Sequence, residues 1–266
     1  MTAIFAFRAL LGILWRELLR FLRQRERFFA ALVRPLVWLL VFAAGFRAAL
    51  GISIIPPYHT YITYETYIVP GLIGMIQLFN GMQSSLSMVY DREMGSMRVL
   101  LTAPLPRWYL LFCKQSAGAF VSVLQGYAFL VIAVLFGIPL PYLGFISALP
   151  AMVLTAFMLG AFGLLISSLI RQLENFAGVM NFVIFPVFFL SSALYPLWKM
   201  AESSRLLYWL CAVNPFTHAV ELVRFSLYFQ VNGLALAVVL GATAVFGAGA
   251  VLGYDPRRGL VRRQTV

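Results

Sequence analysis

Residues 145–170 read FISALPAMVLTAFMLGAFGLLISSLI, a run that contains no charged side chain. An α-helix of about 20 apolar residues can cross the hydrocarbon core of a bilayer, so this stretch predicts a transmembrane helix. The whole chain has the same character, because 62% of its 266 residues are hydrophobic and only 11% are charged. A soluble domain carries about 25% charged residues. The composition therefore excludes a water-soluble enzyme and predicts an integral membrane protein.

Similar apolar runs recur along the chain and predict an all-α protein with six transmembrane spans. Breaks that contain proline separate several of them, as at Pro56-Pro57. The whole chain, 1–266, is then a single transmembrane domain, in which residues 28–195 hold the first five spans and residues 255–266 form a tail. We expect the spans at residues 28–46, 68–90, 115–138, 145–170, 176–195 and 234–254.

Two of the spans carry small side chains on one face. Small side chains let helix backbones approach closely in a bilayer, where the hydrophobic effect does not drive helices together. Both faces therefore predict helix packing within a bundle. They consist of Ala156, Gly160, Gly163 and Ser167 in the fourth span and of Ala237, Gly241 and Ala248 in the last.

Residues 1–27 predict an amphipathic helix that lies in the membrane interface. Ile4, Phe7 and Leu11 recur at helical spacing on one face, while arginines such as Arg16 and Arg20 follow another. The apolar side chains of such a helix enter the acyl region, and its guanidinium groups contact lipid phosphates. The alternative is a cleaved signal peptide, but its charges should precede the apolar stretch, and here most of them follow it.

The distribution of the basic residues predicts an orientation in the membrane. With the amino terminus in the cytoplasm, 16 of the 20 Lys and Arg residues fall on the cytoplasmic side. The four that remain outside are Arg47, Lys199, Arg205 and Arg224. Both termini are therefore expected in the cytoplasm. Because the basic residues flank apolar runs and form no contiguous soluble patch, the net charge of +11 does not indicate a nucleic-acid partner.

The residue types that carry chemistry give no catalytic, cofactor or metal site. A P-loop needs a lysine directly after a glycine, and neither Lys114 nor Lys199 follows one. Cys113 and Cys211 lie far apart in the sequence and are expected to be free thiols. Neither histidine has Cys or carboxylate partners at ligand spacing. We therefore expect no ATPase site, cofactor or metal in this chain.

The second span carries a polar face at helical spacing, with Gln125 in the third span as a weaker candidate of the same kind. Amides are costly in hydrocarbon unless they meet a partner or a water-lined cavity. Two interpretations stay open at this point, interhelical hydrogen bonding or a polar seam that faces a substrate. The residues predicted to border such a path are Gln77, Asn80, Gln83, Ser84 and Asn181.

Residues 91–104, DREMGSMRVLLTAP, follow the second span and predict a short amphipathic helix on the cytoplasmic surface. Prolines close this segment. A six-span protein does not need such an element to cross a membrane, and its combination of charged and apolar residues suits docking to a soluble partner. The docking residues that we predict are Asp91, Arg92, Glu93, Gly95, Ser96, Arg98, Leu101, Thr102 and Pro104.

Residues 196–230 are amphipathic and predict short helices that dip into the outer leaflet and return, although a seventh span is the alternative. Asn214 before Pro215 is a good helix start. Glu221 and Arg224 are spaced i, i+3, so they can form an ion pair on one helix. The predicted lid residues are Pro196, Asn214, Pro215, His218, Glu221 and Arg224.

Taken in order, these segments resemble the type-2 ABC exporter permeases, the family that exports drugs, polysaccharides and lipid-linked glycans. After the second span, that family has a charged run with a glycine, then a pattern of Leu, Thr, Pro and Arg. The corresponding stretches here are residues 91–96 (DREMGS) and 100–104 (LLTAP), followed by Arg107 and Lys114.

Other motifs extend this resemblance over nearly the whole chain. Residues 69–71 (VPG) are similar to the Pro-Gly start of the family's second span, and residues 191–196 (SSALYP) and 214–216 (NPF) are similar to its outer re-entrant region. The length and the six-span plan are most like those of nodulation-factor and daunorubicin exporter permeases. The sequence also resembles permeases encoded with quinoprotein alcohol-oxidation systems.

The resemblance implies a transport subunit of the bacterial cytoplasmic (inner) membrane. Two permease copies, identical or related, would pair with two copies of a P-loop ATPase that binds ATP and Mg. Residues 91–104 would form the coupling helix, and residues 193–228 would cover the exit path of an amphiphilic substrate, such as a drug, lipid or glycan. The alternatives are an integral-membrane enzyme acting on a lipid or a quinone, a secondary carrier and a structural assembly factor.

Overall fold

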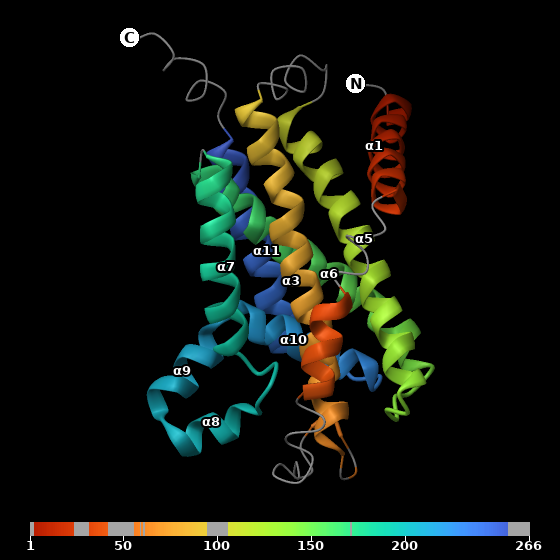
Figure 1. Cartoon of the computed structure of the whole chain (residues 1–266), viewed down its shortest axis with the longest axis vertical. Helices are drawn as coiled ribbons and strands as arrows, with labels where there is room; N and C mark the ends of the chain where they lie inside the picture. Colours follow the sequence, from red (N-terminus) through yellow and green to blue (C-terminus); the bar gives the residue numbers. More distant parts are fainter. Residues whose placement is uncertain are drawn as a thin grey trace.

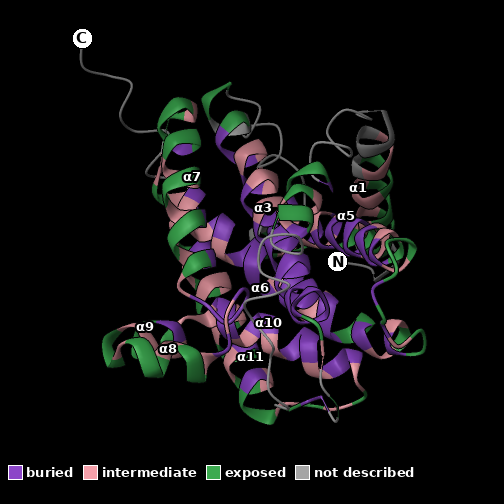
Figure 2. Ribbon diagram, turned by 60° about the horizontal axis from the view of Figure 1, so that its bottom comes forward, coloured by how far each residue is buried: buried purple, intermediate pink, exposed green. Residues whose placement is uncertain are grey.

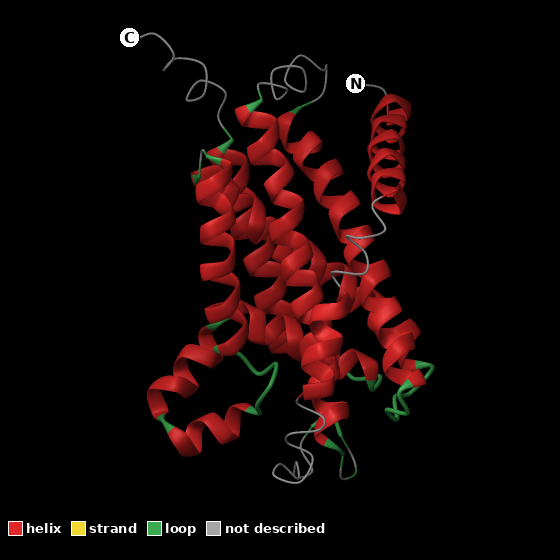
Figure 3. Cartoon of the chain, in the orientation of Figure 1, coloured by secondary structure: helices red, strands yellow, loops and turns green. Residues whose placement is uncertain are grey.

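The computed structural model describes residues 3–23, 32–41, 56–58, 60, 62–94, 106–170 and 172–254. Helices form the elements in these ranges, as Figure 3 shows, and this confirms the predicted all-α class. They are α1 (Ala3–Arg23), α3 (Tyr64–Glu93), α5 (Arg107–Leu135), α6 (Gly144–Leu169), α7 (Leu173–Phe189), α8 (Leu197–Ser203), α9 (Arg205–Val213), α10 (Pro215–Leu227) and α11 (Gly233–Gly253). A further apolar helix runs over Leu32–Val41.

The long helices form a bundle in which successive helices run in opposite directions (Figure 1). At one end, which we call the Glu93 end, Met88 of α3 packs in one apolar cluster with Leu111 of α5, Leu164 of α6 and Tyr254, just after α11. At the opposite end, which we call the Arg224 end, the hydroxyl of Ser147 at the start of α6 donates to a carbonyl of α10. Consecutive spans of a multi-pass protein must run in opposite directions, so this arrangement agrees with the predicted topology.

Among the described residues, three helices are long and apolar enough to cross a membrane, namely Trp108–Leu135 within α5, Gly144–Leu169 and Gly233–Gly253. The pair α9 and α10, bent by 73°, would add a fourth if it formed one broken span. The chain is therefore a multi-pass membrane protein. The second predicted span, 68–90, lies within α3, whereas only part of the first is described. The predicted end of the fifth span at residue 195 is wrong, because α7 ends at Phe189 and the backbone of residues 190–195 is not helical. The count of six spans stays a prediction.

The helix α1 lies beside α5 (Figure 1), and it covers most of the predicted segment 1–27. Phe7, Leu11 and Trp15 on this helix are exposed. They recur at intervals of four residues and therefore form one apolar stripe that does not pack on the rest of the described chain. A stripe of this kind suits an amphipathic helix at a membrane surface, and that position stays a prediction.

The predicted small face of α6 brings its backbone against α3. A Cβ added to Gly81 of α3 would lie 2.8 Å from the carbonyl carbon of Leu159, and one added to Gly163 would lie 2.6 Å from the carbonyl oxygen of Gly81. Side chains larger than hydrogen cannot fit at that separation. Figure 2 shows α6 as one of the most buried helices, which is the expected consequence of this contact.

The prediction that the small face of α11 packs against other helices of the described chain is wrong. Ala237, Gly241 and Ala248 are exposed, and a Cβ at Gly241 would meet nothing within 4 Å. The buried residues of α11 are Ala235, Val239 and Ala250. Nearly every position of this helix is apolar, so the sequence does not indicate which face turns toward α6.

We predict that Gly163→Ala lowers the midpoint of thermal unfolding of the detergent-solubilised protein, because the added methyl group forces α3 and α6 apart. Overpacking of this kind costs about 1–3 kcal/mol. Gly241→Ala is the matched control: it adds the same methyl group to an open position of a helix and should leave the midpoint unchanged or raise it. Equal midpoints for the two variants would contradict the close contact.

Candidate functional site

The predicted docking segment begins inside α3. Asp91, Arg92 and Glu93 are the last residues of that helix. The remaining predicted docking residues lie outside the described residues; they are Gly95, Ser96, Arg98, Leu101, Thr102 and Pro104. Glu93 has a definite contact: its Oε2 accepts a hydrogen bond of 3.1 Å from the backbone N–H of Leu173, the first residue of α7.

Gln77, the first of the predicted path residues, is 1% exposed and bonds to α6. Its Nε2 donates to the carbonyl of Met152 at 2.8 Å, and the hydroxyl of Thr155 donates to its Oε1 at 2.6 Å. Both ends of the amide are thus satisfied within the protein. Sequence reasoning missed Thr155, because a single threonine in an apolar run gives no sign of which helix it faces.

The other predicted path residues do not gather in one place. Asn80 donates through Nδ2 to Oε1 of Gln125 on α5, while Gln83 and Ser84 are half-buried on α3 and Asn181 is exposed on α7. Gln77 and Asn80 therefore join α3 to two different helices, in agreement with the interhelical alternative. A transport path along this face stays a prediction.

We predict that Gln77→Met lowers the free energy of unfolding by about 1 kcal/mol, the usual range for a hydrogen bond between helices in a membrane. The cost should stay small, because the Thr155 hydroxyl keeps its bond to the Ala151 carbonyl. Asn181→Leu is the control at an exposed position and should have no such effect. Equal stability of Gln77→Met and the unmodified chain, measured by unfolding in detergent, would contradict a role in joining α3 to α6.

The segment predicted to face outward consists of α8, α9 and α10, which we call the outer region, and α8 and α9 form an arm that projects from the bundle (Figure 1). Pro196 precedes α8 and is buried. The predicted helix start at Asn214 and Pro215 is confirmed, because Oδ1 of Asn214 accepts a 3.0 Å bond from the N–H of Phe216. His218 lies 2.9 Å, through Nε2, from the carbonyl of Ala212.

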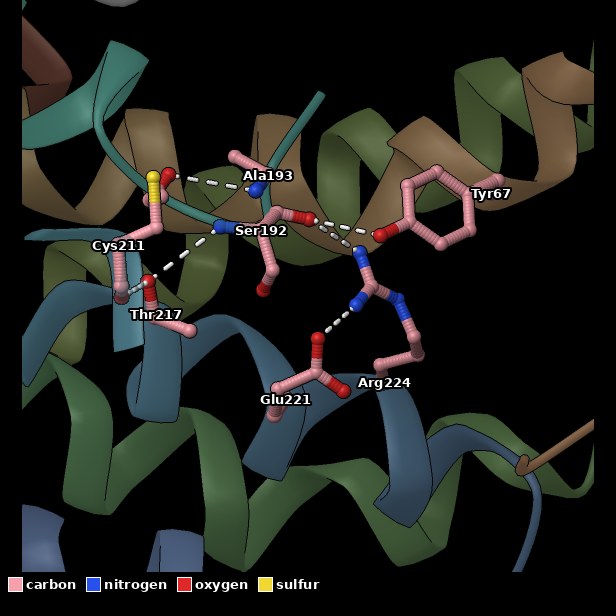
Figure 4. Close-up of polar contacts among 8 residues, drawn as sticks. Tyr67, Ser192, Ala193, Cys211, Thr217, Glu221 and Arg224 are labelled. Atoms are coloured by element: carbon pink, nitrogen blue, oxygen red, sulfur yellow. Dashed lines mark hydrogen bonds and ion pairs between the residues drawn. The ribbon is translucent and has the colours of Figure 1, made fainter. Parts of the chain in front are cut away.

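A buried arginine lies at the centre of this region (Figure 4). Arg224 is 1% exposed and forms the predicted ion pair with Glu221. Its Nη2 donates to the carbonyl of Ser192 at 2.9 Å, and the hydroxyl of Tyr67 donates to the same oxygen at 3.0 Å. The guanidinium carbon lies 4.1 Å from the centre of the Tyr67 ring, which is a cation–π distance.

These contacts hold the segment between α7 and α8 against the bundle. The hydroxyl of Thr217 accepts from the N–H of Ser192 at 3.3 Å and donates to the Cys211 carbonyl at 2.6 Å (Figure 4). The Tyr64 hydroxyl donates to the Leu194 carbonyl at 3.0 Å. Sequence reasoning missed Tyr64 and Tyr67, because tyrosines at the start of an apolar helix usually indicate a membrane interface. It also missed Thr217.

Three buried polar atoms near this cluster have no hydrogen-bond partner among the described residues: Arg224 Nε, Ser192 Oγ and Tyr58 OH. The rings of Tyr58 and Tyr228 pack edge to face, with centres 4.9 Å apart. Elsewhere in the described ranges, no group of three His, Cys, Asp or Glu side chains could hold a metal ion. Cys113 and Cys211 are buried free thiols.

Comparison with known proteins shows which family this chain resembles. Residues 8–228, from α1 to just beyond α10, match the ABC-2 type transporter family. The chain belongs to this family.

Similar proteins carry names of the same kind. This permease is 28% identical over 227 residues to a protein of Cyanophora paradoxa named as a transport permease, ycf38, covering 84% of this chain and 76% of that one. It is 31% identical over 170 residues to a protein of Escherichia coli named as a multidrug ABC transporter permease, YbhR, covering 63% of this chain but 45% of that one. Nodulation protein J of Rhizobium leguminosarum is 20% identical over 218 residues, which are 81% of each chain.

We predict that Glu221→Gln destabilises the permease strongly, because it leaves the Arg224 charge buried without its carboxylate. Breaking a buried pair on one side costs about 3–5 kcal/mol. The double variant Glu221→Gln/Arg224→Met should be more stable than Glu221→Gln alone, since it removes both charges. The measurement is thermal unfolding in detergent.

The permease contains a matched control for this prediction. Lys199 and Glu202 form a pair with the same i, i+3 spacing at 3.3 Å, but their side chains are 49% and 58% exposed. Exposed pairs contribute little, so Glu202→Gln should leave the unfolding midpoint almost unchanged. Similar shifts for Glu202→Gln and Glu221→Gln would contradict the importance of burial at Arg224.

Proposed function

We propose that this permease is the transmembrane subunit of an ATP-driven exporter that moves an amphiphilic substrate, such as a drug, a lipid or a glycan, out of the cytoplasm. The observation that carries the proposal is the family match over residues 8–228, which includes both the docking segment and the outer region. The name of one similar protein, a multidrug ABC transporter permease, supports transport of drug-like compounds.

The energy would come from separate subunits. Neither lysine of this chain follows a glycine, so the chain lacks a P-loop, and ATP with Mg would bind to two copies of a partner ATPase. The ATPases would dock at residues 91–104, at the Glu93 end of the bundle. A second permease copy, identical or related, would complete the complex. This chain itself would bind no cofactor.

The orientation that we propose places the Glu93 end at the cytoplasmic face of a bacterial inner membrane, with both termini in the cytoplasm. Most of the basic residues then lie on that side, as the charge rule requires. The Arg224 end faces outward, with α8 and α9 at the outer leaflet as a lid. A substrate path along the face of Gln77, Asn80, Gln83 and Ser84 toward that lid would require the bonds of Gln77 to α6 and of Asn80 to α5 to open.

The test is assembly with the ATPase followed by stimulation of its activity. We predict that the ATPase copurifies with the permease, that amphiphilic compounds stimulate ATP hydrolysis by the complex in lipid vesicles, and that Gly95→Trp abolishes copurification because it fills the docking surface. Gly12→Trp is the control: Gly12 lies on the exposed surface of α1, where a Cβ would meet nothing within 4 Å.

Two outcomes would contradict the proposal. Copurification that survives both Gly95→Trp and Glu93→Lys would show that residues 91–104 are not the docking segment. Turnover of a lipid or a quinone by the purified permease alone, without ATP or the ATPase, would favour the membrane-enzyme alternative.

A further inference from the structure

The helix α7 is held at both of its ends by side chains from other elements. Along its length it packs against α3, and the residues that it buries are Phe176, Ile184 and Phe188. These contacts are apolar and therefore non-directional. In the part of the chain that the structure describes, the hydrogen bonds between α7 and other elements lie at its two ends, about 25 Å apart for a helix of 17 residues.

At the Glu93 end, the contact satisfies a backbone donor. The first N–H groups of a helix have no partner within it, and the N-cap residue of α7, Gln172, makes no side-chain cap bond. Oε2 of Glu93 accepts the N–H of Leu173 at 3.1 Å instead. A carboxylate is also favoured there by the positive end of the helix dipole. The last residue of α3 thus caps the first residue of α7.

At the Arg224 end, Asn214 satisfies two backbone acceptors. Its Nδ2 donates to the carbonyls of Val187 at 2.8 Å and Leu190 at 2.6 Å, which belong to the last turn of α7 and its C-cap. Its Oδ1 caps the start of α10 at the same time. Because α8 and α9 lie between Leu190 and Asn214 in the sequence, this bond also closes the base of the arm.

We propose that α7 is a tie between the two ends of the bundle, fixed to the docking side by Glu93 and to the base of the lid by Asn214. A displacement of the end of α3 by the ATPase then shifts α7 along its apolar contact with α3, and Asn214 carries the shift to the arm formed by α8 and α9. Glu93 and Asn214 are positioning residues in this scheme. The inference rests on the proposed export function and names the element that transmits the movement.

The chemistry of Asn214 allows its two roles to be separated. Asn214→Asp keeps a carboxylate oxygen that caps α10, since Asp and Asn are equally good N-caps. It removes the Nδ2 donor and sets a negative charge beside two carbonyls, so the bond to α7 is lost. Asn232→Asp is the matched control, because Oδ1 of Asn232 caps α11 through the N–H of Ala235 at 3.0 Å.

The other end of the tie has its own pair of variants. Glu93→Ala removes the acceptor for the N–H of Leu173. Because Glu93 is also a predicted docking residue, its effect is measured only in complexes that retain the ATPase, and Asn214→Asp, which lies outside the docking segment, decides the proposal if Glu93→Ala does not assemble. Glu174→Ala is the control, because Glu174 is an exposed carboxylate in the first turn of α7. It removes the same charge near the same helix end and leaves the contact between Glu93 and Leu173 in place.

The experiment follows the lid with a thiol reporter in the assembled complex. Ser203→Cys, at the exposed end of α8, is introduced after Cys113 and Cys211 are replaced by alanine. Complexes isolated through a tag on the ATPase are placed in vesicles, and labelling by a polar maleimide is timed without nucleotide and with ATP, Mg and vanadate. We expect the labelling rate to change with nucleotide in the parent complex and in both controls.

In Asn214→Asp and in Glu93→Ala, we expect this nucleotide-dependent change to fall to less than half of the parent value. The double variant should lose no more than the larger single loss, since both substitutions interrupt one connection. If Asn214→Asp does not assemble, Asn214→Ser takes its place, because serine also caps α10 but is too short to reach α7.

Three outcomes would overturn the proposal. A full nucleotide response in Asn214→Asp or in Glu93→Ala would show that the lid moves without the tie. Single losses that add in the double variant would indicate two separate connections. A parent complex whose labelling does not respond to nucleotide at all would contradict the export function itself, and the tie with it.

Discussion

The contact between the backbones of α3 and α6 sets the geometry of the rest of the bundle. Gly81 and Gly163 leave no room for a side chain between the two helices. Because the backbones touch, the short amide of Gln77 can reach the Met152 carbonyl and the Thr155 hydroxyl. The side chain of Gln115 from α5 fits beside Gly160 and donates to the Phe157 carbonyl at 2.7 Å.

At the Arg224 end, the contacts supply hydrogen-bond partners to the non-helical backbone between α7 and α8. In a bilayer, backbone groups outside helices need partners supplied by the protein. The Ser192 carbonyl receives donors from Arg224 and Tyr67, and the Leu194 carbonyl receives one from Tyr64. The approach is again close: a Cβ at Gly71 of α3 would collide with the backbone of Ala193. The arginine charge is compensated by Glu221 and is used to hold backbone in place.

The sequence predicts features that depend on near neighbours in the chain. Hydropathy indicates the apolar helices, Asn214-Pro215 indicates the start of α10, and the i, i+3 spacing indicates the pair of Glu221 and Arg224. Each of these patterns involves residues within a turn or two of one another, and helix geometry alone relates them.

Contacts between elements could not be predicted in this way. Periodicity places Gln77 and Asn80 on one face of α3 but does not say which helix covers that face, and the structure joins them to two. The bond from Leu173 to Glu93 crosses 80 positions of sequence. On α11 the apolar residues surround the helix, so small residues such as Gly241 could not indicate the packed side. Tertiary packing decides such pairings, and no periodic pattern in a single sequence indicates them.

Within the outer region, α10 is attached to the bundle, whereas α8 and α9 are not attached in the same way. A Cβ at Gly144 of α6 would collide with the Leu227 carbonyl, and the Ser147 hydroxyl donates to the Ser226 carbonyl at 2.6 Å. With Arg224 bound to Ser192, α10 is therefore anchored to α6 and to the segment after α7. The helices α8 and α9 pack mainly on each other. If this end opens as we propose, α8 and α9 would move while α10 stays attached to α6, so the length of these two short helices would limit the width of the opening.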